Sequence, residues 1–137
     1  LYKLDKKREN LLKDKFEKKI LRLTNKLKIP ALFVCRGMQL ISQIEKIRLV
    51  KVKNHIKKKQ LIFVKSKGNI SVNSFHNYAI FSVPKKYNIL ASHKDGSIEM
   101  MENIKKKHLC IMFHPERYSK DQKYIDLLIQ KFFKLKR

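Results

Sequence analysis

The sequence predicts a three-layer α/β domain, because apolar runs alternate with helical patterns along the chain. The apolar runs cover 31–34 and 109–113, and unbroken runs of this kind are typical of strands buried on both faces, as in a parallel sheet. Helical spacing covers three further stretches: 6–28, 36–47 and 121–135. With 137 residues, the chain is expected to form a single domain over 1–137.

The first helix is amphipathic, with apolar residues three or four positions apart and charged residues opposite. Its apolar positions are Leu12, Phe16, Ile20, Leu23 and Leu27. Because the polar face carries Glu9, Asp14 and Glu17 as well as lysines, we expect this face to cover the sheet. A cationic helix lying on a membrane surface is the alternative.

Between the two apolar runs the pattern changes to short strand-like segments. These segments are 49–53, 60–64, 69–72, 88–92 and 97–101. Lys94-Asp95-Gly96 between the last two predicts a hairpin with Asp-Gly in its turn. The terminal helix is expected to place four side chains inward: Tyr124, Leu128, Phe132 and Leu135.

The net charge of +23 has two interpretations. The charge could attract a polyanionic partner, and a basic nucleic-acid-binding module is therefore the alternative function. Compositional drift is favoured, since the chain has three glycines and its lysine clusters at 57–59 and 105–107 lack interleaved aromatic residues. Nucleic acid is therefore not the expected partner.

Two cysteines, Cys35 and Cys110, do not make a disulfide framework or a Cys-x-x-Cys pair. The chain shows no run of about 18 apolar residues and no signal peptide, so we expect no membrane association and a cytoplasmic location. A start at Leu1 is expected of a fragment or a processed form. Cys110 lies inside an apolar run and is expected in the core.

Cys35 lies at the turn between the first apolar run and a helix that begins at Arg36. The helix N-terminus favours a thiolate, and the backbone N–H of Arg36 can stabilise an oxyanion. His114 has the chemistry of a general base and acid, and Glu116 that of the group that orients its ring. Taken singly, the cysteine also fits a buried core residue and the histidine a hydrogen-bonded strand end.

Four segments together resemble class I glutamine amidotransferase-like proteins of the gamma-glutamyl hydrolase (gamma-glutamyl-gamma-aminobutyrate hydrolase-like) branch. Residues 30–41, Pro-Ala-Leu-Phe-Val-Cys-Arg-Gly-Met-Gln-Leu-Ile, resemble the nucleophile elbow. Val-Asn-Ser-Phe-His-Asn at 72–77 and the Asp-Gly-x-Ile-Glu hairpin at 91–99 are similar to motifs of that branch. Ile-Met-Phe-His-Pro-Glu at 111–116 matches its His-Pro-Glu motif.

The resemblance implies a flavodoxin-like fold and a thiol hydrolase without metal or organic cofactor. The implied reaction cleaves a gamma-glutamyl amide through a glutamyl thioester, with Cys35 as nucleophile, His114 as base and Glu116 as its orienter. The Arg36 amide is implied as one oxyanion donor. The leaving amine stays open among aminobutyrate, a nucleotide amidate and ammonia for a synthase subunit.

The resemblance also implies a substrate-binding set of four residues: Gln39, Asn73, Ser74 and His76. For His76 an exposed loop position is the alternative. Gln39 is expected beneath the nucleophile.

The sequence departs from the family pattern in two ways. Phe33 stands where the elbow usually has glycine, and no glycine precedes Gly37, so the Gly-Gly turn that carries the second oxyanion donor is missing. We therefore expect a fold that lacks its N-terminal strands. A partner chain that supplies them, a longer gene product and a decayed, catalytically impaired relative are the alternatives.

Overall fold

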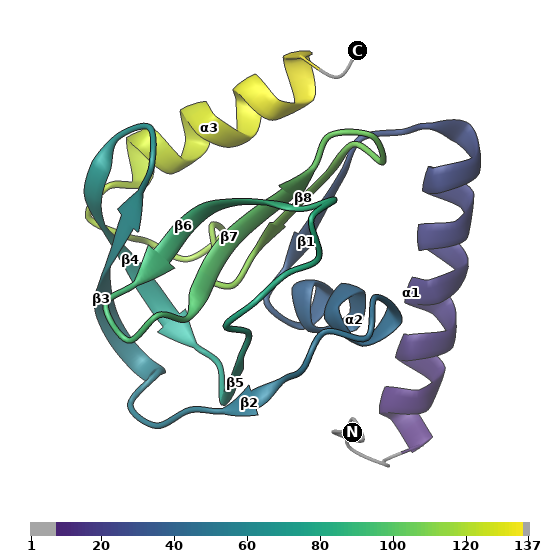
Figure 1. Cartoon of the computed structure of the whole chain (residues 1–137), viewed down its shortest axis with the longest axis horizontal. Coiled ribbons are helices and arrows are strands. Elements are labelled where there is room, and N and C mark those ends of the chain that lie inside the picture. Colours follow the sequence, from purple (N-terminus) through teal and green to yellow (C-terminus); the bar gives the residue numbers. More distant parts are fainter. Residues whose placement is uncertain (1–7, 136–137) are drawn as a thin grey trace.

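The computed structural model describes residues 8–135, which form a curled sheet between helical layers (Figure 1). Helices α1 (Arg8–Leu27) and α2 (Arg36–Ile44) lie on one side of the sheet, and α3 (Gln122–Leu135) lies on the other. The expected three-layer α/β class is therefore confirmed. None of the helices in this part of the chain has the length and apolar character needed to cross a membrane.

Within residues 8–135 the main sheet has six strands in the order β1-β8-β7-β6-β3-β4. Their bounds are β1 (Ala31–Val34), β3 (Ile56–Val64), β4 (Gly68–Phe75), β6 (Asn88–His93), β7 (Ile98–Asn103) and β8 (His108–Ile111). A small second sheet pairs β2 (Val50–Lys51) with β5 (Tyr78–Ala79). The β1–β8 pair is parallel, and the other pairs of the main sheet are antiparallel.

The strands alternate their side chains between two apolar clusters, one on each face of the sheet. On β8, Leu109 and Ile111 join the cluster beneath α3, which includes Ile125 and Phe132 of that helix. Cys110 belongs to the opposite cluster, with residues of α1 and α2, and is fully buried as expected. The two clusters fix which face of the sheet each helix covers.

The expectation that both apolar runs form strands buried on both faces holds for one of them. β8 is buried along its whole length, because β1 and β7 flank it and helices cover both faces. β1 is only half-buried, since it is the edge strand of the sheet in the described part of the chain. Part of the apolar surface of β1 is therefore left uncovered by the described residues.

Helix α1 differs from the expectation in the face that it buries. Its five predicted inward side chains, from Leu12 to Leu27, are 44% to 65% exposed, so the prediction that they cover the sheet is wrong. The helix instead packs through Leu21 and Asp14, which are buried. Asp14 forms an ion pair with Arg36 at the start of α2, and this contact holds α1 by its polar side.

The remaining elements follow the sequence closely. The hairpin β6–β7 turns at Asp95-Gly96, where Gly96 has φ 88°. In α3, Phe132 is buried and both Tyr124 and Leu128 pack against the core as predicted, whereas the side chain of Leu135 lies outside the described residues, as do residues 6 and 7 of the first predicted helix. The predicted strand at 60–64 is longer, because β3 begins at Ile56 and continues through a bulge.

Left-handed backbone positions are occupied by lysine in this glycine-poor chain. Positive φ angles occur at Lys28, Lys46, Lys57 and Lys107. A side chain at such a position costs about 1–2 kcal/mol relative to the right-handed region, and glycine avoids most of that cost. Lys107 ends the β7–β8 turn with φ 56°, and its carbonyl accepts a hydrogen bond from the N–H of Ala31 at 2.9 Å.

Substituting Lys107→Gly is expected to raise the free energy of unfolding by about 0.5–1 kcal/mol. Glycine removes the strain of the positive φ, and this gain is larger than the loss caused by the greater entropy of glycine in the unfolded chain. Lys105→Gly, in the same turn but without a positive φ, is the matched control and is expected to give no gain. Urea denaturation of the variants measures the difference. Equal stability of the two variants would contradict strain at Lys107.

Candidate active site

The cysteine at the strand-to-helix turn has an unusual backbone conformation. Cys35 follows β1 with φ 45° and ψ −96°, a combination that costs about 1–3 kcal/mol for a residue with a side chain. Its N–H donates to the carbonyl of Ile111 at 2.7 Å, and its carbonyl accepts the first helical hydrogen bond of α2 from Gln39 at 3.0 Å. The last bond of the parallel ladder and the first bond of the helix thus meet at one residue, which makes the turn sharp.

The turn accommodates Phe33 in the place of the usual glycine. A Cβ atom added to Gly37 would lie 3.4 Å from the Phe33 Cβ atom, so α2 does approach β1 closely at Gly37. The Phe33 ring packs edge-on against the ring of His108, with 4.9 Å between centroids. This packing directs the ring toward His108, at the other end of the strand pair from Cys35.

The electrostatic environment of Cys35 favours the thiol. Burial raises the pKa of Cys35 above its ordinary value of 9.0, and the carboxylates of Glu116 and Glu99 add to the increase. The backbone N–H of Arg36 opposes it by donating toward the sulfur, but does not outweigh burial. The helix N-terminus therefore acts in the expected direction, but burial has the larger effect on the pKa of this thiol.

The His-Pro-Glu segment holds its histidine in a defined orientation. Nδ1 of His114 lies 2.5 Å from Oε1 of Glu116, which leaves Nε2 available to another partner. Burial has the largest single effect and raises the pKa of Glu116, but the hydrogen bond from His114, a backbone hydrogen bond and the charges of His114 and Arg117 together lower this pKa below its ordinary value. The ring also makes an edge-to-face contact with Phe75, with 5.8 Å between centroids.

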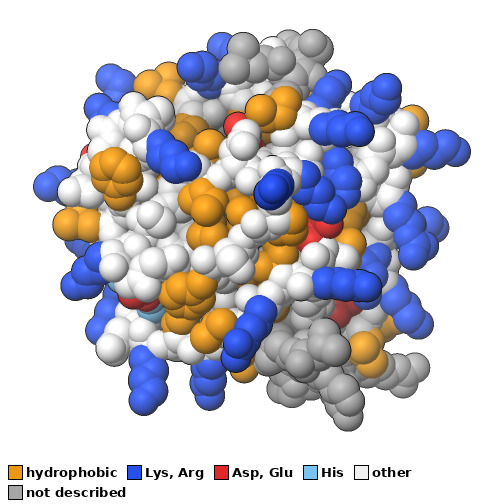
Figure 2. All heavy atoms as spheres, viewed as in Figure 1, with side chains coloured by type: hydrophobic (Ala, Val, Ile, Leu, Met, Phe, Trp, Pro, Cys, Tyr) orange, Lys and Arg blue, Asp and Glu red, His pale blue; other side chains and the backbone are white. Residues whose placement is uncertain are grey.

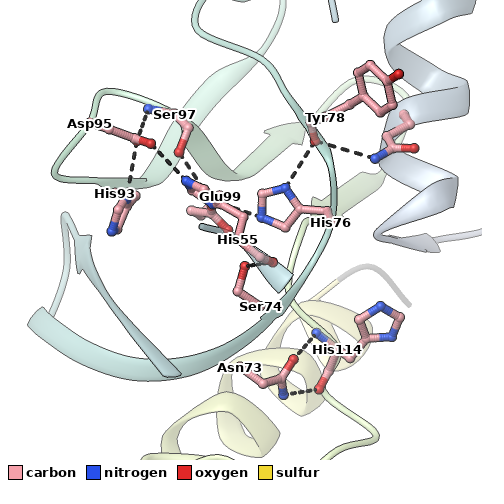
Figure 3. A network of polar contacts seen from close by, with 11 residues as sticks. His55, Asn73, Ser74, His76, Tyr78, His93, Asp95, Ser97, Glu99 and His114 are labelled. Carbon is pink, nitrogen blue, oxygen red and sulfur yellow. Dashed lines mark hydrogen bonds and ion pairs between the residues drawn. The ribbon is translucent and has the colours of Figure 1, made fainter. Parts of the chain in front are cut away.

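Asn73 ties the backbone of this segment to β4. Its side-chain oxygen accepts from the N–H of His114 at 2.9 Å, and its amide nitrogen donates to the carbonyls of His114 at 2.7 Å and Arg117 at 3.1 Å (Figure 3). Ser119 completes the clamp through its hydroxyl. The Asn73 side chain therefore positions His114, because its hydrogen bonds go to the backbone of this segment and not toward solvent.

Parallel pairing brings the two segments to the same edge of the sheet. Val34 lies opposite Ile111 in the β1–β8 ladder, and Cys35 and the His114 segment leave the carboxyl ends of these neighbouring strands. The carboxylate of Glu116 contributes to the pKa of the Cys35 thiol, which also places the two segments near each other. A thiol, an imidazole and a carboxylate thus share one edge, which is the combination that nucleophilic acyl transfer uses.

A comparison with known families and proteins agrees with this geometry. The family model described as Peptidase C26 matches residues 3–116, most of the chain. The chain belongs to the Peptidase C26 family. A gamma-glutamyl-CDP-amidate hydrolase of Campylobacter jejuni is 35% identical over 105 residues, which are 77% of this chain and 52% of that protein. The chain therefore spans about half the length of this curated relative.

Solved structures show that this Peptidase C26 chain has a glutamine amidotransferase-like fold. A Thermoplasma acidophilum protein, assigned to GMP synthase as one of its subunits, superposes with a TM-score of 0.73 and 19% identity, over 88% of this chain and 63% of that one. A glutamine amidotransferase of Thermotoga maritima gives a TM-score of 0.68 and 16% identity, over 100% of this chain and 67% of that one. The expected recognition and fold class are confirmed.

The other predicted substrate-binding residues of this family member face the interior. The amide of Gln39 donates to the carbonyl of Tyr78 at 3.4 Å, and Nδ1 of His76 donates to the same carbonyl at 3.0 Å. The hydroxyl of Ser74 donates to the carbonyl of His55 at 2.6 Å. All three side chains are buried, so His76 does not lie in an exposed loop. A direct contact of these residues with substrate stays a prediction.

Sequence reasoning missed a polar cluster next to these residues. His55 and His93 contact Asp95, while the fully buried Glu99 accepts a hydrogen bond from Ser97 and faces His76 (Figure 3). Asp95 and Glu99 stood in a recognised motif without an assigned role, whereas nothing in the sequence pattern linked His55 to them. The cluster lies beside the candidate active site and not within it.

The pKa of Cys35 predicts how its reactivity depends on pH. Alkylation by iodoacetamide requires the thiolate, so the rate is expected to be slow at neutral pH and to rise about tenfold per pH unit through pH 9. Cys110 is fully buried and is expected to stay unlabelled while the chain is folded. Mass spectrometry of the labelled peptides measures both rates, with Cys110→Ser as the control. A rate that is already maximal near neutral pH would show a resting thiolate and contradict this prediction.

Proposed function

We propose that this chain carries the catalytic Cys-His-Glu part of a gamma-glutamyl amide hydrolase. The observation that carries the proposal is the parallel β1–β8 pairing, which sets Cys35 and the His114–Glu116 pair at one edge of the sheet. The curated Campylobacter jejuni relative, named as a gamma-glutamyl-CDP-amidate hydrolase, supports the reaction class.

The geometry suggests a reaction that starts from the neutral thiol. Because Glu116 holds Nδ1 of His114, Nε2 takes the proton of Cys35 as the sulfur attacks the amide carbon. The tetrahedral intermediate collapses, the C–N bond breaks, and the imidazolium gives its proton to the leaving amine. A water molecule, deprotonated by His114, then adds to the thioester, and the C–S bond breaks to release glutamate and the thiol.

The backbone N–H of Arg36 is proposed as one donor to the oxyanion. Its hydrogen bond toward the sulfur of Cys35 supports this role, because the carbon that the sulfur attacks would lie on the same side. One such donor typically contributes about 3–4 kcal/mol to the barrier reduction. Because the donor is the backbone N–H, its contribution does not depend on the Arg36 side chain, which forms an ion pair with Asp14.

A gamma-glutamyl nucleotide amidate is the proposed substrate, since the Campylobacter jejuni relative is named for such a compound. Gamma-glutamyl-aminobutyrate and glutamine are the alternatives that share the glutamyl group. Gln39, Asn73, Ser74 and His76 are proposed to shape the glutamyl pocket, with Asn73 acting through the position of His114. A free thiol nucleophile needs a reducing compartment, and we propose the cytoplasm.

A further polypeptide segment is proposed to complete the domain, of which residues 1–137 are one part. The apolar face of α1 is exposed and β1 is an edge strand, and both features suit a segment that adds a strand beside β1 and packs against α1. The match covers 52% of the curated relative, so the remaining part of that relative is long enough to contain such a segment. The same segment would carry the second oxyanion donor, in one polypeptide or as a partner chain; a synthase subunit is the other candidate partner.

The distribution of charge on the face drawn in Figure 2 does not favour a nucleic-acid-binding function. Figure 2 shows lysine and arginine side chains spread around this face with apolar side chains between them, rather than gathered in one stripe. A nucleic-acid surface usually concentrates its positive charge along the path of the backbone. We therefore do not propose a nucleic-acid partner.

Activity assays with three gamma-glutamyl amides, including gamma-glutamyl-CDP amidate, test the proposed reaction. Cys35→Ala is expected to abolish hydrolysis, and His114→Asn to lower kcat by about 10³-fold or more, because each removes a member of a cooperating unit. Diazo-oxonorleucine is expected to label Cys35 and spare Cys110. Cys110→Ser is the control and should keep full activity. Hydrolysis that survives Cys35→Ala, or equal labelling of both cysteines, would refute the proposal.

The completing segment is tested by co-expression with the part of the Campylobacter jejuni relative that the match does not cover. A stable complex with a higher melting temperature is expected, because it buries the apolar face of α1. The double variant Leu12→Glu, Phe16→Glu should lose the complex without loss of its own stability, since both side chains are exposed. Leu127→Glu, an equally exposed leucine on α3, is the matched control. A complex that withstands the α1 variant would place the contact elsewhere.

A further inference from the structure

We propose that His55, His76 and Glu99 bind a divalent transition-metal ion, with Zn²⁺ as the preferred ion. Each of the three residues offers one ligand atom, and these atoms lie within 4.8 Å of one another. All three side chains are buried, and Figure 3 shows them directed toward one another. Two imidazoles and one carboxylate form a ligand set that suits zinc.

The hydrogen bonds of the two histidines leave one nitrogen of each ring without a proton. Nε2 of His55 lies 2.9 Å from Oδ2 of Asp95, and Nδ1 of His76 lies 3.0 Å from the carbonyl oxygen of Tyr78. A carboxylate and a carbonyl only accept hydrogen bonds, so these two nitrogens carry the ring hydrogens. In the neutral rings, Nδ1 of His55 and Nε2 of His76 then have lone pairs, and neither has a hydrogen-bond partner among the described residues.

This arrangement matches the surroundings of histidines that bind metals. A ligating histidine usually donates its second N–H to a carboxylate or a backbone carbonyl, which fixes the ring and makes the ligating nitrogen more basic. Asp95 has this role for His55, and Tyr78 has it for His76. Asp95 is itself held in place, because its Oδ1 accepts a hydrogen bond from the N–H of Ser97 at 2.9 Å and lies 3.0 Å from Nδ1 of His93.

Glu99 needs a positive partner that the described hydrogen bonds do not provide. Its side chain is fully buried, its Oε1 accepts a bond from Ser97 at 3.3 Å, and its Oε2 has no partner among the described residues. Oε1 also faces Nε2 of His76 at 3.6 Å, which is too long for a hydrogen bond. A buried carboxylate opposite a nitrogen lone pair is unfavourable unless a cation lies between them.

Charge balance and access also suit a divalent ion. Glu99 supplies one buried negative charge and the exposed Asp95 a second one behind His55, so the two together balance the charge of a divalent ion. A surface hollow of about 950 Å³ reaches His55, His93 and Asp95 and gives an entry path from solvent. His93, whose Nδ1 lies 3.0 Å from Oδ1 of Asp95, sits at this entrance, and a water molecule would complete the coordination.

The proposed role of the ion is structural. It would join the segment before β3 to the end of β4 and to β7, which are far apart in the chain. Cys35 and His114 are not among the proposed ligands, so the ion would not occupy the reacting groups; His76 is the one ligand that is also proposed to shape the glutamyl pocket. The competing explanation is a proton on His76 that forms a plain ion pair with Glu99, and it predicts no metal uptake.

Metal binding is tested in a Cys35→Ser, Cys110→Ser background, so that thiols do not contribute. Zn²⁺ titrated against a chelating dye is expected to bind with 1:1 stoichiometry at micromolar protein, and to raise the melting temperature, whereas Mg²⁺ does neither. Co²⁺ in the same chain is expected to give the intense visible absorption of a four- or five-coordinate site. Absence of stoichiometric binding by both ions would overturn the proposal.

Variants assign the binding to the cluster. Glu99→Gln and His55→Gln are expected to abolish stoichiometric zinc binding, and Asp95→Asn to weaken it about 10–100-fold by releasing the ring of His55. Glu102→Gln on the same strand and His108→Gln, a buried histidine outside the cluster, are the matched controls and should bind zinc normally. Unchanged binding in Glu99→Gln and His55→Gln would overturn the proposal. If one of these two variants fails to fold, the other and the Co²⁺ spectrum still decide.

Discussion

The parallel pairing of β1 with β8 is the constraint on which the candidate active site depends. It is the parallel pair in a sheet whose other strands run antiparallel, and it ends with the hydrogen bond from Cys35 to Ile111. Because both strands end at the same edge, the chain can place a sulfur and an imidazole together although they are distant in sequence. The strained backbone at Cys35 is maintained by this last ladder bond and by the first turn of α2.

The same strand pair marks where the described domain is least covered. β8 has neighbours on both sides and a buried surface throughout, whereas β1 has one neighbour and stays half-exposed. Beside it, α1 contacts the rest through the Asp14–Arg36 ion pair, the Asn25–His108 hydrogen bond and Leu21, while its apolar face points outward. The candidate catalytic residues thus lie next to a strand edge without a described neighbour, in a chain that spans about half the length of its curated relative.

Much of the fold was predictable because local patterns and core packing agree. β1 matched its predicted bounds, and the Asp95-Gly96 turn and the buried Cys110 also followed from the sequence. The buried face of α1 could not be predicted, since amphipathic spacing identifies an apolar face but not whether a partner for it lies in the chain. The extent to which burial raises the pKa of Cys35 could not be predicted, since burial depends on residues that are distant in the sequence. The cluster around Glu99 was missed because His55 joins it through tertiary packing alone.

One backbone oxygen connects the two polar regions of the molecule. The carbonyl of Tyr78 accepts from His76 of the buried cluster and from Gln39, which lies one helical turn after the nucleophile. The two regions therefore share one main-chain acceptor, so a substitution that moves the backbone at Tyr78 would disturb His76 and Gln39 together.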